Sequence, residues 1–469
     1  MPLVKLPFSG GAFQSVDDFE LSNSPNSPRL VNFLLNDAGS NISRPALESF
    51  ASINDKVIGL TAFKNKLIGV NDNRDVYSTD PSSAVATDVT GIKLPGSDRP
   101  VFAQDGEILV IAGGDQIIKY AGSGTTEFLE GSPPRASHIV FLDGYFIANE
   151  VGSGRFRIAG PTGLTRLVWD PLDVTTAEGL PDNIVSMGVS ERNLFLLGTN
   201  STEVFNNFGD AITPFQRIAF IDTGTSAPYS LVNAINTIWY LDDARRFVKI
   251  ENRFPRIISG PFDRILQQMT TVDDCYGRVI EIESQYIIVW TFPTEQKTFW
   301  YSYKNEQWGE FAGFSGGKET RFNYNAYAYE PSTNTHFTGA FSSGQLSKFK
   351  FGVFQDNGEH LFRLRRSAPI DHGSSVRKRS KLLRIRGKRG GGVSLTTTPE
   401  PVLSMRYRDE MGPWSDWQTS GLGRVGDPNP QIEFYNLGIY RSRQWEIAVT
   451  DDIGFTVQNL EEDIDIMVS

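Results

Sequence analysis

The segment IVFLDGYFIAN, residues 139–149, consists of two short apolar runs separated by the pair Asp143-Gly144. An Asp-Gly pair between apolar runs is a strong short-range signal for a β-hairpin with a tight turn. Five similar phrases occur along the chain: GLTAFKNKLIGV from Gly59, VFAQDGEILVIAG from Val101, MGVSERNLFLLG from Met187, LVNAINTIWYL from Leu231 and VIEIESQYIIVW from Val279. The sequence therefore predicts six hairpins.

The spacing of these hairpins suggests a radial repeat. Their turns lie near residues 65, 106, 144, 193, 236 and 285, at intervals of 38 to 49 residues. A four-stranded propeller blade takes roughly 40–50 residues. Further strands such as DVYSTD and RFRIAG fall between the hairpins and would complete the blades. We therefore expect a propeller of about six blades over residues 51–345, with a large sandwich of irregular hairpins as the alternative.

Composition agrees with an all-β fold. The 469 residues include 32 Phe, 15 Tyr and 8 Trp, and aromatic side chains pack well on pleated sheets. This length exceeds what one core usually holds, so more than one packed unit is expected. The best helix signal is FDRILQQM from Phe262, which we expect to form a short helix between blades.

The two ends of the chain differ from the middle. Alternating runs such as VLSMRYRDE and QWEIAVTD predict an antiparallel β-sandwich after the propeller. We assign residues 346–469 to a basic loop followed by this sandwich, which we call the platform. Residues 1–50 are expected to form an arm that contributes to the platform.

Charge is distributed unevenly. The formal net charge is −10, yet residues 363–389 contain eleven Lys or Arg and one acidic residue, Asp371, so the rest of the chain carries −20. One basic stretch on an acidic body suits the orientation of a partner.

Signals of catalysis, cofactors or metal binding are weak. The four histidines are far apart in the sequence and are expected at the surface or in turns, and the single cysteine, Cys275, fits a buried apolar filler. We expect no enzyme activity, no catalytic residue, no cofactor and no metal site. The opening residues lack the charged and apolar regions of a secretion signal, which favours folding in the cytoplasm.

Several stretches resemble one family in the same order along the chain. PNSPRLVNFLLN followed by SRPALESF resembles the start of the tail hub or nozzle proteins of short-tailed bacteriophages, also called packaged-DNA stabilisation proteins. FLLGTNSTEVFNNFGDAITPFQRI, with Glu203, Gly209, Asp210, Pro214 and Phe215, resembles the family's most recognisable blade. YIIVWTFPTEQKTFWYSYKNEQWGEF, MRYRDEMGPWSDWQTSGLGRVG and LGIYRSRQWEIAVTDDIGFTV resemble later parts.

The resemblance implies a structural protein of the virion tail, assembled in the bacterial host cytoplasm. It implies a homo-oligomer, a hexameric ring beneath the portal-adaptor protein, that docks a tail fibre or spike and a tail needle or plug protein. Packaged duplex DNA would pass through the ring without tight binding, because an acidic body repels the phosphate backbone. No small-molecule substrate is implied.

The basic stretch supplies the candidate contacts to an acidic partner, with a solvated flexible loop as the alternative because GKRGGG favours mobility. The candidates are Arg377, Lys378, Arg379, Lys381, Arg384, Arg386, Lys388 and Arg389.

Two other functions stay open at this stage. A propeller-type glycan-binding or glycoside-processing protein would need carboxylates and aromatic rings converging on one mouth. A protein-interaction propeller would be a monomer in solution, whereas the hub reading predicts a six-fold ring.

Overall fold

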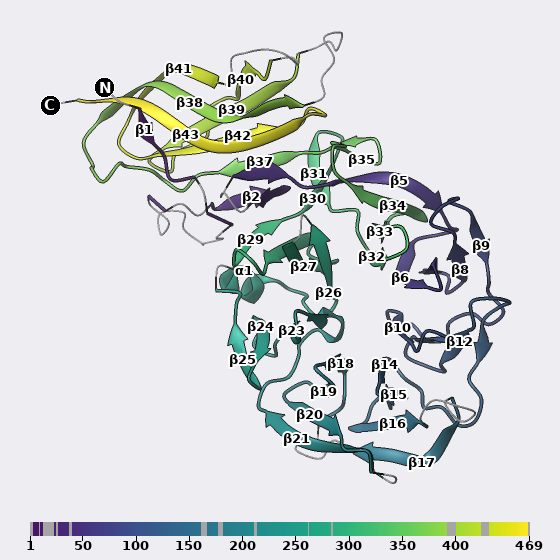
Figure 1. Cartoon of the computed structure of the whole chain (residues 1–469). Helices are drawn as coiled ribbons and strands as arrows, with labels where there is room; N and C mark the ends of the chain where they lie inside the picture. The colour runs from purple at the N-terminus through teal and green to yellow at the C-terminus, as the bar shows by residue number, and fades with distance from the viewer. Residues whose placement is uncertain are drawn as a thin grey trace.

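The computed structural model describes residues 3–8, 10–12, 23–24, 27–36, 40–160, 167–176, 182–210, 213–260, 262–282, 285–391, 400–423 and 431–467, with side chains for all but 171–174, 388–391 and 431. The fold is all-β, as predicted. Most of the chain forms a ring of sheets, and strands from both ends form a second body beside it (Figure 1).

Within the described residues the ring holds seven four-stranded antiparallel units, one more than the six hairpins predicted. Their strands are β6–β9 (Val57–Phe63, Lys66–Asn71, Val76–Thr79, Ala86–Asp88), β10–β13 (Val101–Gln104, Leu109–Ala112, Ile118–Tyr120, Glu127–Phe128), β14–β17 (Ile139–Leu142, Tyr145–Asn149, Arg155–Ala159, Trp169–Thr176), β18–β21 (Ser186–Ser190, Asn193–Leu197, Thr202–Asn207, Phe215–Ile221), β22–β25 (Val232–Ala234, Thr237–Leu241, Phe247–Glu251, Phe254–Ile257), β26–β29 (Tyr276–Ile282, Gln285–Phe292, Lys297–Ser302, Gln307–Glu310) and β32–β34 (Ala326–Glu330, Thr335–Gly339, Gln345–Lys350) with β5 (Ala46–Ser52).

Tight turns set the hairpins of the blades. Leu142 pairs with Tyr145, so Asp143 and Gly144 form a two-residue turn, with φ of 50° and 89°. Positive φ at both positions gives a turn whose twist matches that of the strands. The six predicted hairpins are confirmed by the pairing of their strands; residues 283 and 284, in the turn of the sixth, lie outside the described residues.

The blades pack face to face. One buried cluster joins Val110 and Ala112 of the second blade to Phe146 of the third, and another joins Phe195 of the fourth to Ile238 of the fifth. Each blade buries its faces against its neighbours, so the ring needs no single central core.

The seventh blade closes the ring with strands from distant parts of the chain. β5 pairs with β34, with Leu47 opposite Phe349 and Ser52 opposite Gln345. The turn of its first hairpin, between Glu330 and Thr335, spans four residues, as does the turn between Gln104 and Leu109 in the second blade. Both β5 and β34 run across the predicted boundaries at residues 50 and 345.

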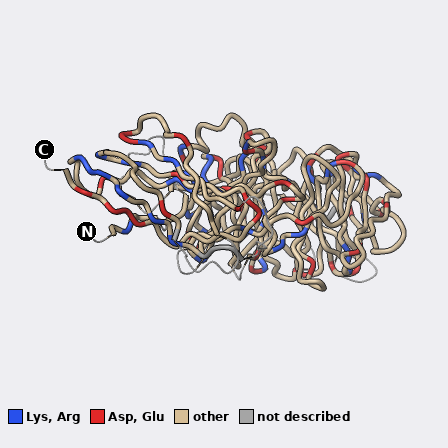
Figure 2. Tube along the Cα trace, turned by 90° about the horizontal axis from the view of Figure 1, so that it is seen from above, with Lys and Arg blue, Asp and Glu red and all other residues tan. Residues whose placement is uncertain are grey.

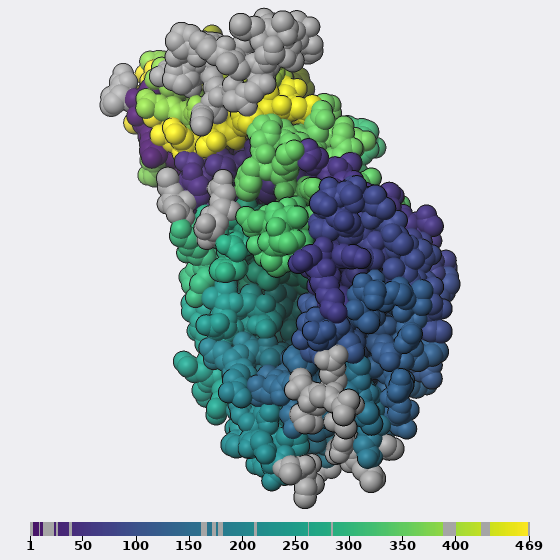
Figure 3. Space-filling view, turned by 45° about the vertical axis from the view of Figure 1, so that its right-hand side comes forward, coloured from purple at the N-terminus to yellow at the C-terminus, as the bar shows by residue number. Residues whose placement is uncertain are grey.

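The platform is a two-sheet sandwich built from both ends of the chain. One sheet contains β1 (Val4–Lys5), β3 (Phe33–Leu35), β4 (Asn41–Ser43), β43 (Gly454–Ile466), β38 (Lys378–Gly391) and β41 (Gln431–Tyr440), and the other contains β2 (Arg29–Val31), β37 (Arg363–Arg366), β42 (Arg443–Val449), β39 (Val402–Asp409) and β40 (Gln418–Gly421). Leu383 of the first sheet and Ile447 of the second belong to the same buried cluster. Figure 3 shows the platform stacked against one side of the ring, with the purple N-terminal segments between them.

One sheet runs from the sixth blade into the platform. β29 pairs in parallel with β2 through Val31 and Glu310, and β2 pairs antiparallel with β37. The resulting nine-stranded sheet, from β26 to β40, makes the two parts continuous through backbone hydrogen bonds.

Smaller elements complete the described structure. The predicted helix is confirmed as α1 (Asp263–Gln268), and Cys275 is buried. Two hairpins, β30–β31 (Ala312–Ser315, Lys318–Arg321) and β35–β36 (Gln355–Asp356, Glu359–His360), and the 3-10 turn η2 (Pro228–Ser230) link larger units. In the described part of the chain, no helix is long and apolar enough to cross a membrane.

Candidate functional site: the platform and the propeller pockets

The first arginines of the basic stretch point into the platform. Arg363 and Arg365 of β37 are fully buried. Arg363 donates to Ser43 Oγ at 3.0 Å and to the carbonyls of Asp451 and Ile453. Arg365 donates to the Gly10 carbonyl at 2.8 Å and lies over the Phe8 ring. Burial lowers the pKa of Arg363 to about 10 and that of Arg365 to about 9, so these charges belong to the core and not to an outer surface.

The segment expected to be a basic loop is largely the central strand β38. Leu383 and Ile385 point inward and alternate with outward Arg384 and Arg386, the period expected of a strand with one buried face. The expectation of a flexible loop, which relied on the glycines of GKRGGG, is therefore wrong for most of this segment: the alternating apolar residues hold it in the sheet.

Acidic neighbours neutralise much of the outer face of β38, which lies between β41 and β43. Figure 2 shows blue and red lengths of chain side by side at the platform end, beside the two termini. The ion pairs are Lys381–Asp465 at 2.7 Å, Arg384–Glu433 at 2.8 Å and Arg386–Glu461 at 3.1 Å.

The remaining candidates differ in accessibility. Lys378 is buried, and its Nζ donates to the Val376 and Arg441 carbonyls at 2.9 and 2.8 Å. Arg377 and Arg379 are exposed and form no ion pair with any described residue. The side chains of Lys388 and Arg389 lie outside the described set. Among the eight candidates, Arg377 and Arg379 are therefore the described side chains that are both exposed and outside an ion pair.

A second basic surface lies on the other sheet and was not predicted. Arg366, Arg406 and Arg408 surround the Trp414 ring, with guanidinium carbons 5.0, 4.8 and 4.8 Å from its centroid. Buried Glu446 accepts from Arg366 Nε and Arg406 Nε, both at 2.7 Å. Only the motif MRYRDEMGPWSDW could have signalled this cluster, since Glu446 lies far along the sequence.

The junction of propeller and platform is held by Asn32 and Arg44, both buried. The Asn32 amide donates to the carbonyls of Ala312 and Phe362 and accepts from Arg44 Nε at 2.8 Å. Arg44 also pairs with Asp356 and lies 4.5 Å above the Phe322 ring. These residues belong to the opening motifs that resembled the phage family.

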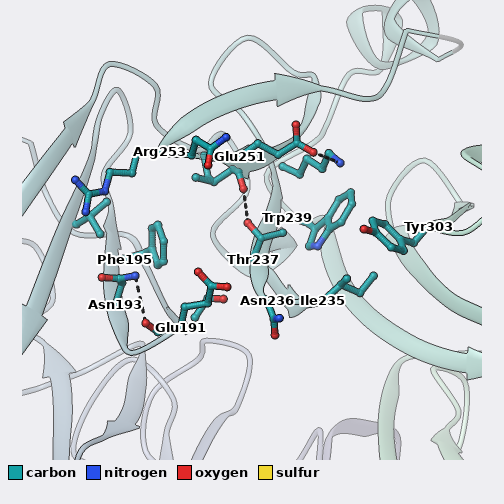
Figure 4. A pocket seen from close by; sticks show the side chains of 15 residues that line it. Glu191, Asn193, Phe195, Ile235, Asn236, Thr237, Trp239, Glu251, Arg253 and Tyr303 are labelled. Carbon is teal, nitrogen blue, oxygen red and sulfur yellow. Dashed lines mark hydrogen bonds and ion pairs between the residues drawn. The ribbon is translucent and has the colours of Figure 1, made fainter.

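A pocket of about 500 Å³ opens between the fourth and fifth blades (Figure 4). Glu191, Asn193, Phe195, Asn236 and Glu251 are among its lining residues. Trp239 also lines it but is fully buried, packed against Tyr303 and 5.4 Å from Lys249 Nζ. A buried indole offers no open face for stacking on a sugar.

The histidines lie apart in space as well as in sequence. His138 is buried and stacks on Tyr229, His336 bonds to Tyr327, and His360 pairs with Asp452. The description of histidines as surface or turn residues is wrong for His138. Among the described residues, no group of three His, Cys, Asp or Glu side chains is placed to hold a metal ion.

Comparison with known proteins decides the family. A family model described as "Phage_stabilise: Bacteriophage P22 Gp10, beta-propeller" matches residues 74–330, more than half of the chain. The chain belongs to this family. The matched residues run from the first blade into the seventh. Membership of the P22 Gp10 β-propeller family supports a structural role in a phage tail.

Solved propellers resemble this Gp10-family chain only distantly. The WD40 β-propeller domain of Doa1 has 11% identity and a TM-score of 0.43, over 65% of this chain and 97% of that one. The computationally designed Ika8 protein has 11% identity and a TM-score of 0.41, over 66% and 100%. BamB from Moraxella catarrhalis has 10% identity and a TM-score of 0.41, over 69% and 97%. We infer nothing about function from these three. The curated proteins contain no match to this chain.

Proposed function

We propose that the chain is the ring-forming subunit of a phage tail hub or nozzle, continuing the DNA conduit below the portal and its adaptor. The match of the Gp10 propeller family over residues 74–330 carries this proposal. The ring retains packaged DNA, passes it during ejection and docks a fibre, spike or plug protein.

Two features support it. The nine-stranded sheet fixes the platform relative to the propeller, as a subunit needs if copies are to close into a ring. Ion pairs on β38 also reduce the positive charge that would bind passing DNA.

The symmetry of the assembly tests the proposal. Negative-stain images of tails labelled on this chain should show six copies in a ring next to the portal. A monomer attached at the periphery, or a different symmetry, would contradict it.

A charge reversal can test the proposed contact between β38 and an acidic partner. It should leave Lys378 unchanged, because reversing a buried charge would destabilise the core. We expect Arg377→Glu with Arg379→Glu to reduce incorporation into tails and to leave the melting temperature nearly unchanged. The matched control is Arg135→Glu with Arg192→Glu, the same charge change at exposed propeller sites. Equal incorporation of both double variants would refute the contact.

Passive DNA passage predicts weak binding. The purified protein should bind duplex DNA poorly at moderate salt, with little change on neutralising Arg384, Arg386, Lys388 and Arg389. A tight, salt-sensitive complex that these substitutions abolish would instead place the strand at the DNA.

A further inference from the structure

The propeller encloses a pocket of about 280 Å³ on its axis. Its lining comes from all seven blades, at the innermost strands or the residues just before them. The contributors include Thr61, Phe102, His138, Met187, Tyr229, Arg278 and Tyr327. The pocket is therefore a product of ring closure, since no one or two blades could form it.

Arg278 lines this pocket, and two further arginines, Arg99 and Arg321, lie near it without lining it. The Arg99 guanidinium carbon lies 3.7 Å from the Tyr276 ring centroid, and Arg321 Nη2 donates to the hydroxyl of the same tyrosine at 3.1 Å. Arg99 and Arg321 also donate to the carbonyl and the side-chain oxygen of Asn325. Arg278 stands two residues after Tyr276 on β26, which places both side chains on one face of that strand, and it lines the pocket.

These charges have less compensation than those of Arg44 and Arg363. Arg44 has Asp356, and Arg363 has three oxygen acceptors. In contrast, Arg99, Arg278 and Arg321 form no ion pair with a described carboxylate.

Donor capacity is also left over. The three guanidiniums make four hydrogen bonds within the described structure, although each has about five N–H donors. The Nε atoms of Arg99 and Arg321 are buried and have no hydrogen-bond partner among the described residues.

The electrostatics agree with this geometry. Burial, together with the like charges of Arg278 and Arg321, lowers the pKa of Arg99 to about 10. The nearby carboxyl of Asp98 is itself disfavoured as an anion, because burial raises its pKa. Gathering like charges with spare donors in a partly desolvated site is costly without an anion.

We propose that the axial pocket binds a small multiply charged oxyanion, of the phosphate or polycarboxylate class, held by Arg278, which lines the pocket, with Arg99 beside it. Planar guanidinium groups bind such oxygens through paired, charge-assisted hydrogen bonds. The bound ion joins the segment before the second blade to the sixth blade, and so stabilises the closed ring. This site does not depend on the tail-hub role.

Arg278 is the residue to change. It is only partly buried and its one described hydrogen bond is to the neighbouring Gly277 carbonyl, so Arg278→Gln should fold. The matched control is Arg256→Gln, on the outermost strand of the fifth blade, where the arginine already pairs with Glu251.

Calorimetric titration of the full chain with inorganic phosphate, and separately with citrate, tests the proposal against sodium chloride at equal ionic strength. We expect saturable binding of at least one of the two, weakened at least about tenfold by Arg278→Gln and unchanged by Arg256→Gln. The anion that binds more tightly, phosphate or citrate, identifies the class of ligand. Absence of saturable binding in both arms, or equal binding by wild type and Arg278→Gln, would overturn the site.

Thermal unfolding gives a second readout that a merely structural arginine would not produce. Without phosphate or citrate, Arg278→Gln should melt at or above the wild-type temperature, since it removes a repelling charge. With the binding anion the order should reverse, because only the wild type gains from the ligand. A variant that melts lower by the same amount in both buffers would contradict the proposal.

Discussion

The propeller and the platform both bury the faces of β-sheets, but they take their strands from different parts of the sequence. Blades of the propeller are mostly hairpins of adjacent strands, closed by two-residue turns and packed through apolar faces. The platform joins strands from both ends of the chain and buries arginines between them. Local pairing needs little beyond the hairpin itself, whereas distant pairing needs specific polar contacts to fix its register.

The largest expected effect is at the junction. Arg44→Ala removes the partner of Asp356, which is only 10% exposed, and should lower the free energy of unfolding by about 3–5 kcal/mol. Lys350→Ala breaks an ion pair with Glu48 in the same region, but both side chains are exposed, so it should cost less than about 1 kcal/mol. Denaturant titration measures both. Equal losses of stability in the two variants would show that the buried ion pair of Arg44 contributes no more than an exposed one.

Acid should weaken the propeller through His138. Burial lowers its pKa from 6.5 to about 4, so between these values the unfolded chain binds the proton and the folded one does not. This contribution to stability is present above pH 6.5 and is lost as the pH falls toward 4, by up to roughly 3 kcal/mol.

Melting curves from pH 4 to 7 test the His138 effect. His138→Gln should flatten the acid side of the profile, whereas His360→Gln, whose ion pair with Asp452 is solvated, should not. Parallel profiles for wild type and His138→Gln would exclude His138 as the cause.

A hairpin turn should give a smaller, local effect. Gly106 has a φ of 88° with open space around its Cα, so Gly106→Ala adds only backbone strain, about 1–2 kcal/mol. Gly260 has equal space without a positive φ, and Gly260→Ala should change stability little. Chemical denaturation of the two variants checks this. Equal free energies of unfolding would mean that the positive φ at Gly106 does not contribute to the stability of the blade.

The smallest effect is expected on the outer face of β38. Lys381→Ala breaks an exposed pair with Asp465 and should cost less stability than any of the changes above, with a still smaller loss in high salt. A loss comparable to that of Arg44→Ala would show that the outer face of the platform stabilises the fold as strongly as its interior. Denaturant titration at two salt concentrations is the measurement.

The difference between the two regions also explains what the sequence could predict. Pairs such as Asp143-Gly144 and Ile235-Asn236 lie between the strands they join, so local pattern was enough for six blades. The seventh was missed because its fourth strand, β5, comes from the opening residues, far along the sequence from β32–β34. Arg363 and Arg365 counted as surface charges because their acceptors, Ser43 and Gly10 among them, lie more than 300 residues away.

The candidate residues on β38 show the same limit. Their positive charge was visible in the sequence, but Glu433, Glu461 and Asp465 become neighbours only through the register of β38 with β41 and β43. The sequence could not predict that Arg278 and Arg99 lie close together, since they come from different parts of the ring.

The continuous sheet has a mechanical consequence. β2 contributes three residues and meets β29 through the single pair Val31 and Glu310. A pull that separates the platform from the ring loads this short seam, together with the Asn32 amide that spans Ala312 and Phe362. The blades are joined internally by longer ladders, so under tension the seam gives way while each blade stays intact. The backbone pairing that resists this pull therefore comes from a few residues near the beginning of the chain.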